Sequence, residues 1–78
     1  PLRVIVPLTD WKEHYSKAHW MVLIEPKKKN GLQKLSAADA FQIRSISTRR
    51  LMHKIGDLEA ESMEMVLRAV QIVVGFEI

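Results

Sequence analysis

Two short runs of apolar, mostly β-branched residues stand out near the start of the chain and predict strands. The first covers residues 3–9 and the second covers residues 20–26, and such runs are typical of buried strands. Pro7 cannot donate a hydrogen bond to a neighbouring strand, so we expect the first strand to end or bulge there. Pro26 ends the second strand. Residues 10–19, between the two strands, predict a polar loop that contains aromatic side chains.

An alternating pattern of apolar and polar residues follows between residues 35 and 47. In a strand, Phe41 and Ile43 would share one face, and Gln42 and Arg44 would share the other, because successive side chains of a strand point to opposite faces. This alternation is the clearest amphipathic strand pattern in the sequence.

Turn signals lie on both sides of this segment. Asn30 and Gly31 follow three consecutive lysines and predict a tight turn. After the segment, Thr48 could cap a short helical turn, and residues 53–55 predict a short strand.

The last third of the chain predicts one amphipathic helix. Asp57 is a suitable N-cap residue, and glutamates in the first turns suit the helix dipole. Gly75 is expected to end the helix. The predicted core-facing stripe has helical spacing and consists of Met63, Val66, Leu67, Val70 and Val74. Several strands followed by one helix predict a mainly β or α+β fold, with residues 1–78 as a single domain.

Composition and charge narrow the range of functions. The chain has 78 residues and no cysteine, which excludes disulfides, thiolate metal sites and a cysteine nucleophile. The formal net charge of +3 is uneven, because residues 1–55 hold 11 basic and 4 acidic residues whereas residues 56–78 hold 1 and 5. The basic part suits a polyanionic partner. Neither a membrane-spanning run nor a signal peptide is evident, so we expect a cytoplasmic protein without a membrane partner.

Several side chains could carry chemistry, and each also has a plain structural interpretation. The three histidines, at positions 14, 19 and 53, could serve in acid–base cleavage of RNA, but their spacing fits surface residues better and matches no metal site. The lysines at 27–29 could bind phosphate or simply form a solvated turn. Trp11 could stack on an unpaired base, whereas Trp20 begins a strand and is expected to pack in the core.

The order of the segments resembles the MazF/PemK family of toxin endoribonucleases. The residues that carry the resemblance are Pro7-Leu8-Thr9, Gly31-Leu32, Ser36, Gln42-Ile43-Arg44 and Arg50-Leu51, in that order. The resemblance extends over essentially the whole chain. It implies a small SH3-like barrel of the MazF/PemK/CcdB type with a C-terminal helix, acting as a homodimer.

The resemblance also implies a reaction and a set of partners. The family cleaves single-stranded RNA at short sequences without a metal or other cofactor, through attack of the 2′-OH on the adjacent phosphorus. An antitoxin with an acidic tail neutralises it. Thr9 corresponds to the family's catalytic threonine or serine. We expect the RNA to be bound by Trp11, Lys12, Lys17, Gln42 and Arg44.

The sequence departs from the family at its beginning. The family's first strands and its glycine-rich loop with the catalytic arginine have no counterpart in these residues. The resemblance therefore implies the C-terminal portion of a toxin domain, incomplete at its N-terminus and inactive alone. A missing N-terminal segment or a partner chain would then complete the barrel. Two alternatives stay open: a non-enzymatic CcdB-like toxin that poisons gyrase, and a module that binds nucleic acid or antitoxin without chemistry.

Overall fold

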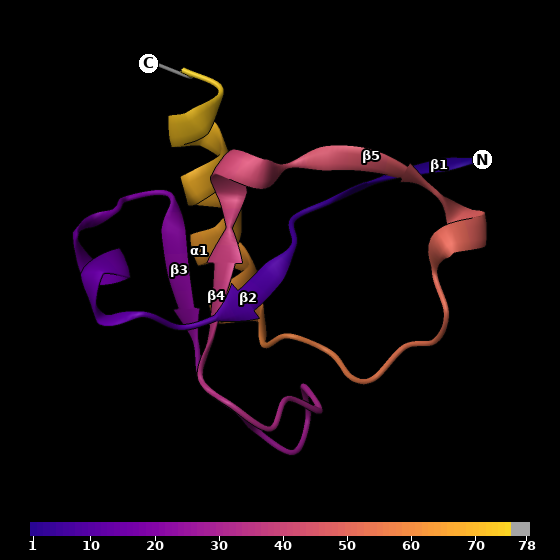
Figure 1. Ribbon diagram of the computed structural model, residues 1–78, viewed down its shortest axis with the longest axis horizontal. Helices are drawn as coiled ribbons and strands as arrows, with labels where there is room; N and C mark the ends of the chain where they lie inside the picture. The colour runs from indigo at the N-terminus through magenta and orange to yellow at the C-terminus, as the bar shows by residue number, and fades with distance from the viewer. Residues whose placement is uncertain (76–78) are drawn as a thin grey trace.

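The computed structural model describes residues 1–75, which form two antiparallel sheets and one α-helix (Figure 1). The strands are β1 (Leu2–Ile5), β2 (Leu8–Asp10), β3 (Met21–Ile24), β4 (Ser36–Asp39) and β5 (Arg44–Ser47). Three short 3-10 helices, η1 (Glu13–Lys17), η2 (Ala40–Gln42) and η3 (Thr48–Arg50), lie between them, and α1 (Ala60–Val73) follows. Within this part of the chain, no helix is both long and apolar enough to cross a membrane.

A long antiparallel ribbon, kinked in the middle, connects the two sheets. Its first half pairs β1 with β5, and its second half pairs β2 with β4. The kink lies between the pairs Ile5↔Arg44 and Leu8↔Ala38. Residues 6 and 7 on one side of the ribbon therefore lie opposite the five residues 39–43 on the other side. The predicted strand break at Pro7 is confirmed. Pro7 donates no hydrogen bond, but its carbonyl oxygen accepts one from the Asp39 amide at 3.0 Å.

The prediction of one amphipathic strand through residues 41–44 is wrong, because the 3-10 helix η2 lies between β4 and β5 at this point. The Asp39 carboxylate accepts a hydrogen bond from the Phe41 amide at 3.1 Å and caps η2. Gln42 ends η2, whereas Arg44 begins β5, so these two residues do not share one strand face. A local side-chain hydrogen bond therefore prevails over the alternation of the sequence.

The short strand predicted at residues 53–55 is also absent from the described structure. This segment instead packs its backbone against the turn at residues 27–31. The Asp57 amide donates to the Lys29 carbonyl at 2.9 Å. A side chain on Gly56 would lie 2.4 Å from the Asn30 carbonyl carbon, so the two backbones approach too closely for any residue larger than glycine.

The core lies where α1 packs against β3, β4 and η2. Its buried residues are Val22, Ile24, Ala38, Ala40, Val66 and Ala69. Trp20 packs against this cluster as expected, with its ring edge-to-face to Phe41 at a centroid distance of 5.4 Å. The first strand pair lies outside this core and extends to the side of the molecule as an arm (Figure 1).

The helix differs in two respects from its prediction. It begins after Glu59 rather than after Asp57, because Asp57 is held by the ion pair with Lys54 at 2.7 Å. The predicted stripe is only partly buried: Val66 is 6% exposed, whereas Leu67 is 57% exposed. Met63 and Val74 are exposed as well. The core contacts come from Val66 and Val70, as predicted, and from Ala69 and Val73, which the predicted stripe did not include. The predicted stop at Gly75 is confirmed by its left-handed φ of 72°.

The turn predicted at Asn30 and Gly31 is confirmed. Asn30 is 8% exposed, and its side-chain oxygen accepts hydrogen bonds from the amides of Lys27 and Leu32, at 3.0 and 2.9 Å. It also donates to the Glu25 carbonyl at 2.8 Å. Gly31 has a φ of 70°, a conformation that residues with a Cβ rarely adopt. One buried amide side chain therefore closes the whole lysine-rich turn.

Replacing Gly31 tests the close packing of this turn. We expect Gly31→Ala to be more destabilising than Gly75→Ala, because both residues have positive φ but only Gly31 has a neighbouring backbone in the way. A Cβ at Gly31 would lie 2.2 Å from the Ile55 carbonyl oxygen, whereas nothing lies within 4 Å at Gly75. The left-handed conformation alone costs about 1–2 kcal/mol. Urea unfolding measures both variants, and equal losses would contradict the packing described here.

Candidate nucleic-acid interface

Thr9 lies at the centre of β2, one of the two outer strands of the three-stranded sheet. It pairs with Ala37 of β4 and is exposed. The kink at Pro7 lies two residues before Thr9 in the chain. Two residues after Thr9, the Trp11 amide donates a hydrogen bond to the Leu35 carbonyl at 3.1 Å. The backbone around Thr9 is therefore fixed on both sides, while the residue itself remains accessible to a ligand.

Trp11 belongs to a small aromatic cluster beside η1. Its ring lies edge-to-face with that of Tyr15, at a centroid distance of 5.8 Å, and Tyr15 in turn contacts His14 at 4.7 Å. Trp11 and Tyr15 are half-buried and line one wall of a groove of about 400 Å³. The opposite wall is α1, with Met65 and Arg68. Packing with Tyr15 thus orients the Trp11 ring but leaves part of it accessible.

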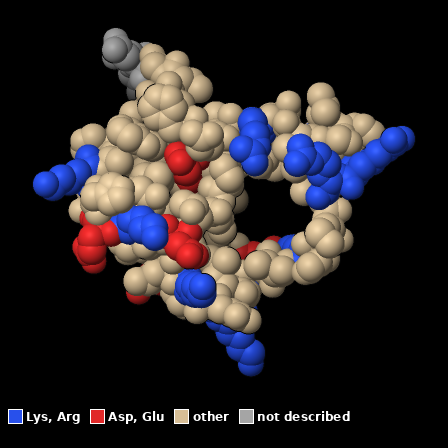
Figure 2. Space-filling model, viewed as in Figure 1, with Lys and Arg blue, Asp and Glu red and all other residues tan. Residues whose placement is uncertain are grey.

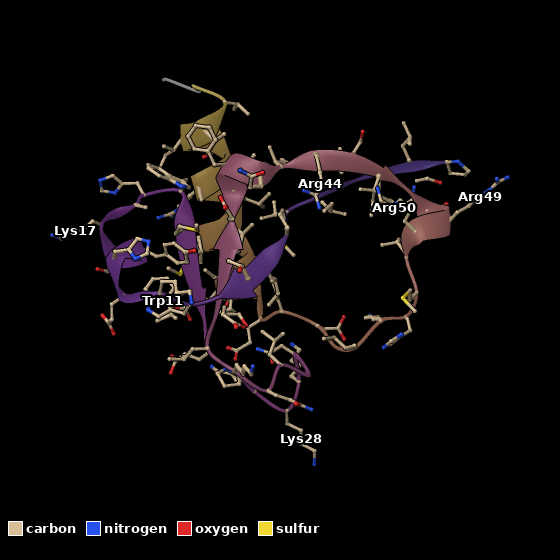
Figure 3. All side chains as sticks on the ribbon, viewed as in Figure 1. Trp11, Lys17, Lys28, Arg44, Arg49 and Arg50 are labelled. Carbon is tan, nitrogen blue, oxygen red and sulfur yellow. The ribbon has the colours of Figure 1, made fainter. Side chains whose placement is uncertain are left out.

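Lys12 and Lys17 lie at the two ends of η1, and both are exposed. The Lys12 carbonyl accepts a hydrogen bond from the Tyr15 amide at 2.9 Å, which holds the first turn of η1. Figure 3 shows Lys17 extending away from the body on the same side of the molecule as Trp11. Three of the predicted RNA-binding residues therefore lie close together in one loop.

The other two predicted RNA-binding residues lie elsewhere. Gln42 and Arg44 are exposed, and they come from η2 and β5. Figure 3 places Arg44 on the arm, across the molecule from Trp11 and Lys17. The predicted RNA-binding residues therefore form two groups in the structure. Strand β2, which carries Thr9, lies between these groups (Figure 1).

The lysine-rich turn is partly neutralised by the start of α1. Lys27 forms an ion pair with Glu59 at 2.6 Å, which raises the pKa of Lys27 and lowers the pKa of Glu59. In the same way, the hydrogen bond from Lys54 lowers the pKa of Asp57. Both pairs are solvated, so water and salt screen them. Of the three consecutive lysines, Lys27 is thus less suited to a phosphate than the exposed Lys28.

The histidines do not form a joint site. His14 and His19 are exposed near η1, whereas His53 is exposed in the segment between η3 and α1. Among residues 1–75, no three histidine, aspartate or glutamate side chains converge in a way that could hold a metal ion.

Sequence reasoning did not find the grouping of arginines on the arm. Arg3, Arg49 and Arg50 join Arg44 there, since β1 pairs with β5 and η3 follows β5 directly. The one sequence signal for this patch is the lack of any acidic residue in segments 1–9 and 40–56.

With this geometry in view, comparison with known proteins identifies the family. Residues 1–74 match the model of the PemK-like, MazF-like toxins of type II toxin–antitoxin systems. The chain belongs to this family, as its sequence motifs had indicated. No curated protein matches the chain.

Solved structures confirm the fold. The chain is similar to the Mycobacterium tuberculosis toxin MazF-mt6, with a TM-score of 0.81 and 18% identity over 99% of this chain and 73% of that one. A second structure, described as an Mtb toxin, gives a TM-score of 0.76 and 19% identity over 92% and 74% of the two chains. The predicted combination of antiparallel strands and a C-terminal helix is therefore the MazF toxin fold.

Proposed function

We propose that this protein is an endoribonuclease toxin that cleaves single-stranded RNA at specific short sequences. The observation that carries the proposal is the position of Thr9, which is exposed in an outer strand and which the resemblance matches to the family's catalytic threonine or serine. Membership of the toxin family supports the same conclusion. With RNA as its substrate, the toxin would act in the cytoplasm.

The proposed reaction is an internal transesterification. The 2′-OH of the substrate loses its proton as its oxygen attacks the adjacent phosphorus, the bond from phosphorus to the 5′ oxygen of the next nucleotide breaks, and that oxygen takes up a proton. The products are a 2′,3′-cyclic phosphate, which can open to a 3′-phosphate, and a 5′-OH. Because the nucleophile belongs to the substrate, the reaction needs no activated water and no enzyme nucleophile, and the family resemblance implies that it needs no metal or other cofactor. The Thr9 hydroxyl would donate a hydrogen bond to the scissile phosphate and stabilise charge as the phosphorane forms.

An arginine is expected to share this role. The resemblance assigns it to a glycine-rich loop upstream of Pro1, and a guanidinium is well suited to stabilise the phosphorane. A guanidinium is a poor base because its pKa is so high. Arg3 and Arg44 belong to other parts of the family pattern and do not take this role.

The division of the predicted RNA-binding residues suggests a path for the substrate. Trp11, Lys12 and Lys17 would bind the RNA on one side of Thr9, and Gln42 and Arg44 would bind it on the other. The partly exposed Trp11 ring could stack on a base, while the lysines contact phosphates. An antitoxin with an acidic tail would compete for the same basic surface, and the family resemblance implies a homodimer.

An apolar groove supports a further strand in the complete domain. The groove has a volume of about 310 Å³ and lies between the arm and α1. Every lining residue is apolar: Val4, Val6, Leu8, Ala38, Ile43, Leu58, Met63, Val66, Leu67 and Val70. Figure 2 shows an opening through the molecule beside it, below the arm.

Within residues 1–75, β1 and β2 are each paired along one edge only. We propose that the upstream strand implied by the family resemblance pairs with the free edge and fills this groove.

Replacing Leu67 with aspartate tests this assignment of the groove. In the protein extended upstream to its natural start, we expect Leu67→Asp to lower stability by several kcal/mol, because the charge would be buried without a partner. Ile72→Asp is the control, since Ile72 is similarly exposed but lies outside the groove. Urea unfolding measures both variants. Equal effects in the extended protein would mean that no strand covers Leu67.

Thr9 is tested by mutation and product analysis in excess EDTA. We expect the extended wild-type protein to cleave mixed-sequence RNA under these conditions and to leave cyclic-phosphate or 3′-phosphate ends. Thr9→Ala should lower cleavage by orders of magnitude and leave the fold intact, because Thr9 is exposed. Thr48→Ala, in η3, is the matched control and should retain activity. Full activity of a folded Thr9→Ala protein would exclude this catalytic role, and RNA binding without any cleavage by the wild type would favour the binding-module alternative.

Gln42 is expected to contribute to sequence choice rather than to stability. It is exposed at the end of η2, where its amide can reach the edge of a base. Gln42→Ala should therefore change which sequences are cut, as measured by sequencing the product ends, with little change in the unfolding midpoint. Gln71→Ala, on the exposed side of α1, should leave the pattern unchanged. An equal loss at all sequences would rule out base recognition by Gln42.

A further inference from the structure

The arm formed by β1, β5 and η3 carries four arginines and no acidic residue. Arg3 comes from β1, Arg44 from β5, and Arg49 and Arg50 from η3. No aspartate or glutamate occurs in segments 1–9 and 40–56. Figure 2 shows blue atoms, and no red ones, along the upper right of the molecule where the arm lies. We refer to these four residues as the arginine arm.

The strand register places two of these arginines on one face. Arg3 pairs with Ile46, and Arg44 pairs with Ile5. Directly paired residues lie on the same face of a ribbon, so Arg3 and Arg44 are diagonal neighbours, about 7–8 Å apart at the backbone. Their long side chains can therefore contact different phosphate groups of one strand. Ile5 and Ile46, between them, are half-buried and offer little apolar surface.

The other two arginines are presented by a well-defined turn. The Ser47 hydroxyl accepts a hydrogen bond from the Arg49 amide at 3.2 Å, and the Thr48 carbonyl accepts one from Leu51 at 3.1 Å. The Thr48 amide donates to the Pro1 carbonyl at 3.0 Å, which ties the turn to the start of β1. Figure 3 shows Arg49 extending outward at the tip of the arm, and Arg50 between Arg49 and Arg44 along the arm in this view. The turn thus holds the backbone of both residues in place.

These guanidinium groups remain available for a ligand. The ion pairs within residues 1–75 are Lys27–Glu59, Lys54–Asp57 and Arg68–Glu64, and none of them involves the arm. All four arginines are exposed. Arg3 also donates one hydrogen bond to the neighbouring Leu2 carbonyl, at 3.1 Å. Four exposed like charges repel one another, and a polyanion would relieve that repulsion.

We propose that the arginine arm binds the phosphate backbone of single-stranded RNA outside the cleavage site. The inference rests on the proposed function and specifies how a long substrate is held. Arginine forks match phosphate oxygens in a bidentate way, and the arm reads no base, so this contribution is independent of sequence. An acidic peptide would also be attracted, but the arginine-bearing face of β1 and β5 lacks exposed apolar side chains to recognise its residues.

The position of the arm predicts a dependence on substrate length. β1 and β5 lie beyond the Pro7 kink, away from Thr9 in β2. A short RNA with two nucleotides on each side of the cut would not extend along the arm, whereas a longer RNA would. The arm should therefore lower KM for long substrates and leave kcat unchanged.

The test compares Arg49→Gln/Arg50→Gln with Lys34→Gln/Lys54→Gln in the full-length natural protein. The control removes the same two charges from exposed positions elsewhere. We expect the arm variant to bind a long RNA at least tenfold more weakly and to raise KM for it. Cleavage of the short RNA should not change. The slope of log K against log salt should become shallower by about 1.4, because two phosphate contacts on a single strand are lost.

The outcomes separate this proposal from the proposed function. If the wild type cuts no RNA, the proposed function fails. The salt dependence of RNA binding, given by the slope of log K against log salt, then still tests whether the arm binds RNA. If both double variants weaken binding equally, the effect is one of net charge and the arm is not a binding surface. If the arm variant loses affinity for an acidic peptide such as poly-glutamate but keeps its affinity for RNA, the partner is a protein and the proposal is wrong. A second variant, Arg3→Gln/Arg49→Gln, should weaken binding of the long RNA in the same way and also leave cleavage of the short RNA unchanged.

Discussion

The arrangement of this protein depends on the lack of an amide hydrogen at Pro7. Because Pro7 cannot pair with the opposite strand, the long ribbon breaks there, and the opposite strand accommodates three extra residues as η2. The break directs β2 and β4 under α1 and directs β1 and β5 away from the body as an arm. The separation of one core from one projecting arm therefore follows from a single backbone constraint.

This separation also divides the chemistry. The body positions Thr9 on an outer strand and packs the aromatic cluster of Trp11 and Tyr15 beside it. The arm carries exposed arginines with no acidic neighbours in its own segments. The apolar groove lies between the two parts, where the kink has moved the strands away from the helix. The proposed catalytic residue and the proposed RNA-binding arginines thus lie on one continuous, kinked pair of strands and its adjoining turn.

Two features of the sequence were misleading for the same reason. The alternation at residues 41–44 is real, but the Asp39 carboxylate caps a 3-10 helix there, and this contact depends on how the strand before it ends. The apolar stripe of α1 is also real, yet Met63 and Leu67 face the groove instead of the core. In both cases the periodicity identified apolar residues correctly but could not determine what would lie against them.

The sequence by itself determined the local features of this protein. It identified the strand break at Pro7, the turn at Asn30-Gly31, the helix stop at Gly75 and the toxin family, because each depends on residues close together in the chain. Only the tertiary structure decided which face of α1 is buried, that the predicted RNA-binding residues form two groups, and that Arg3 joins Arg44 on one face. These relationships depend on strand register and helix packing, which bring together residues about forty positions apart.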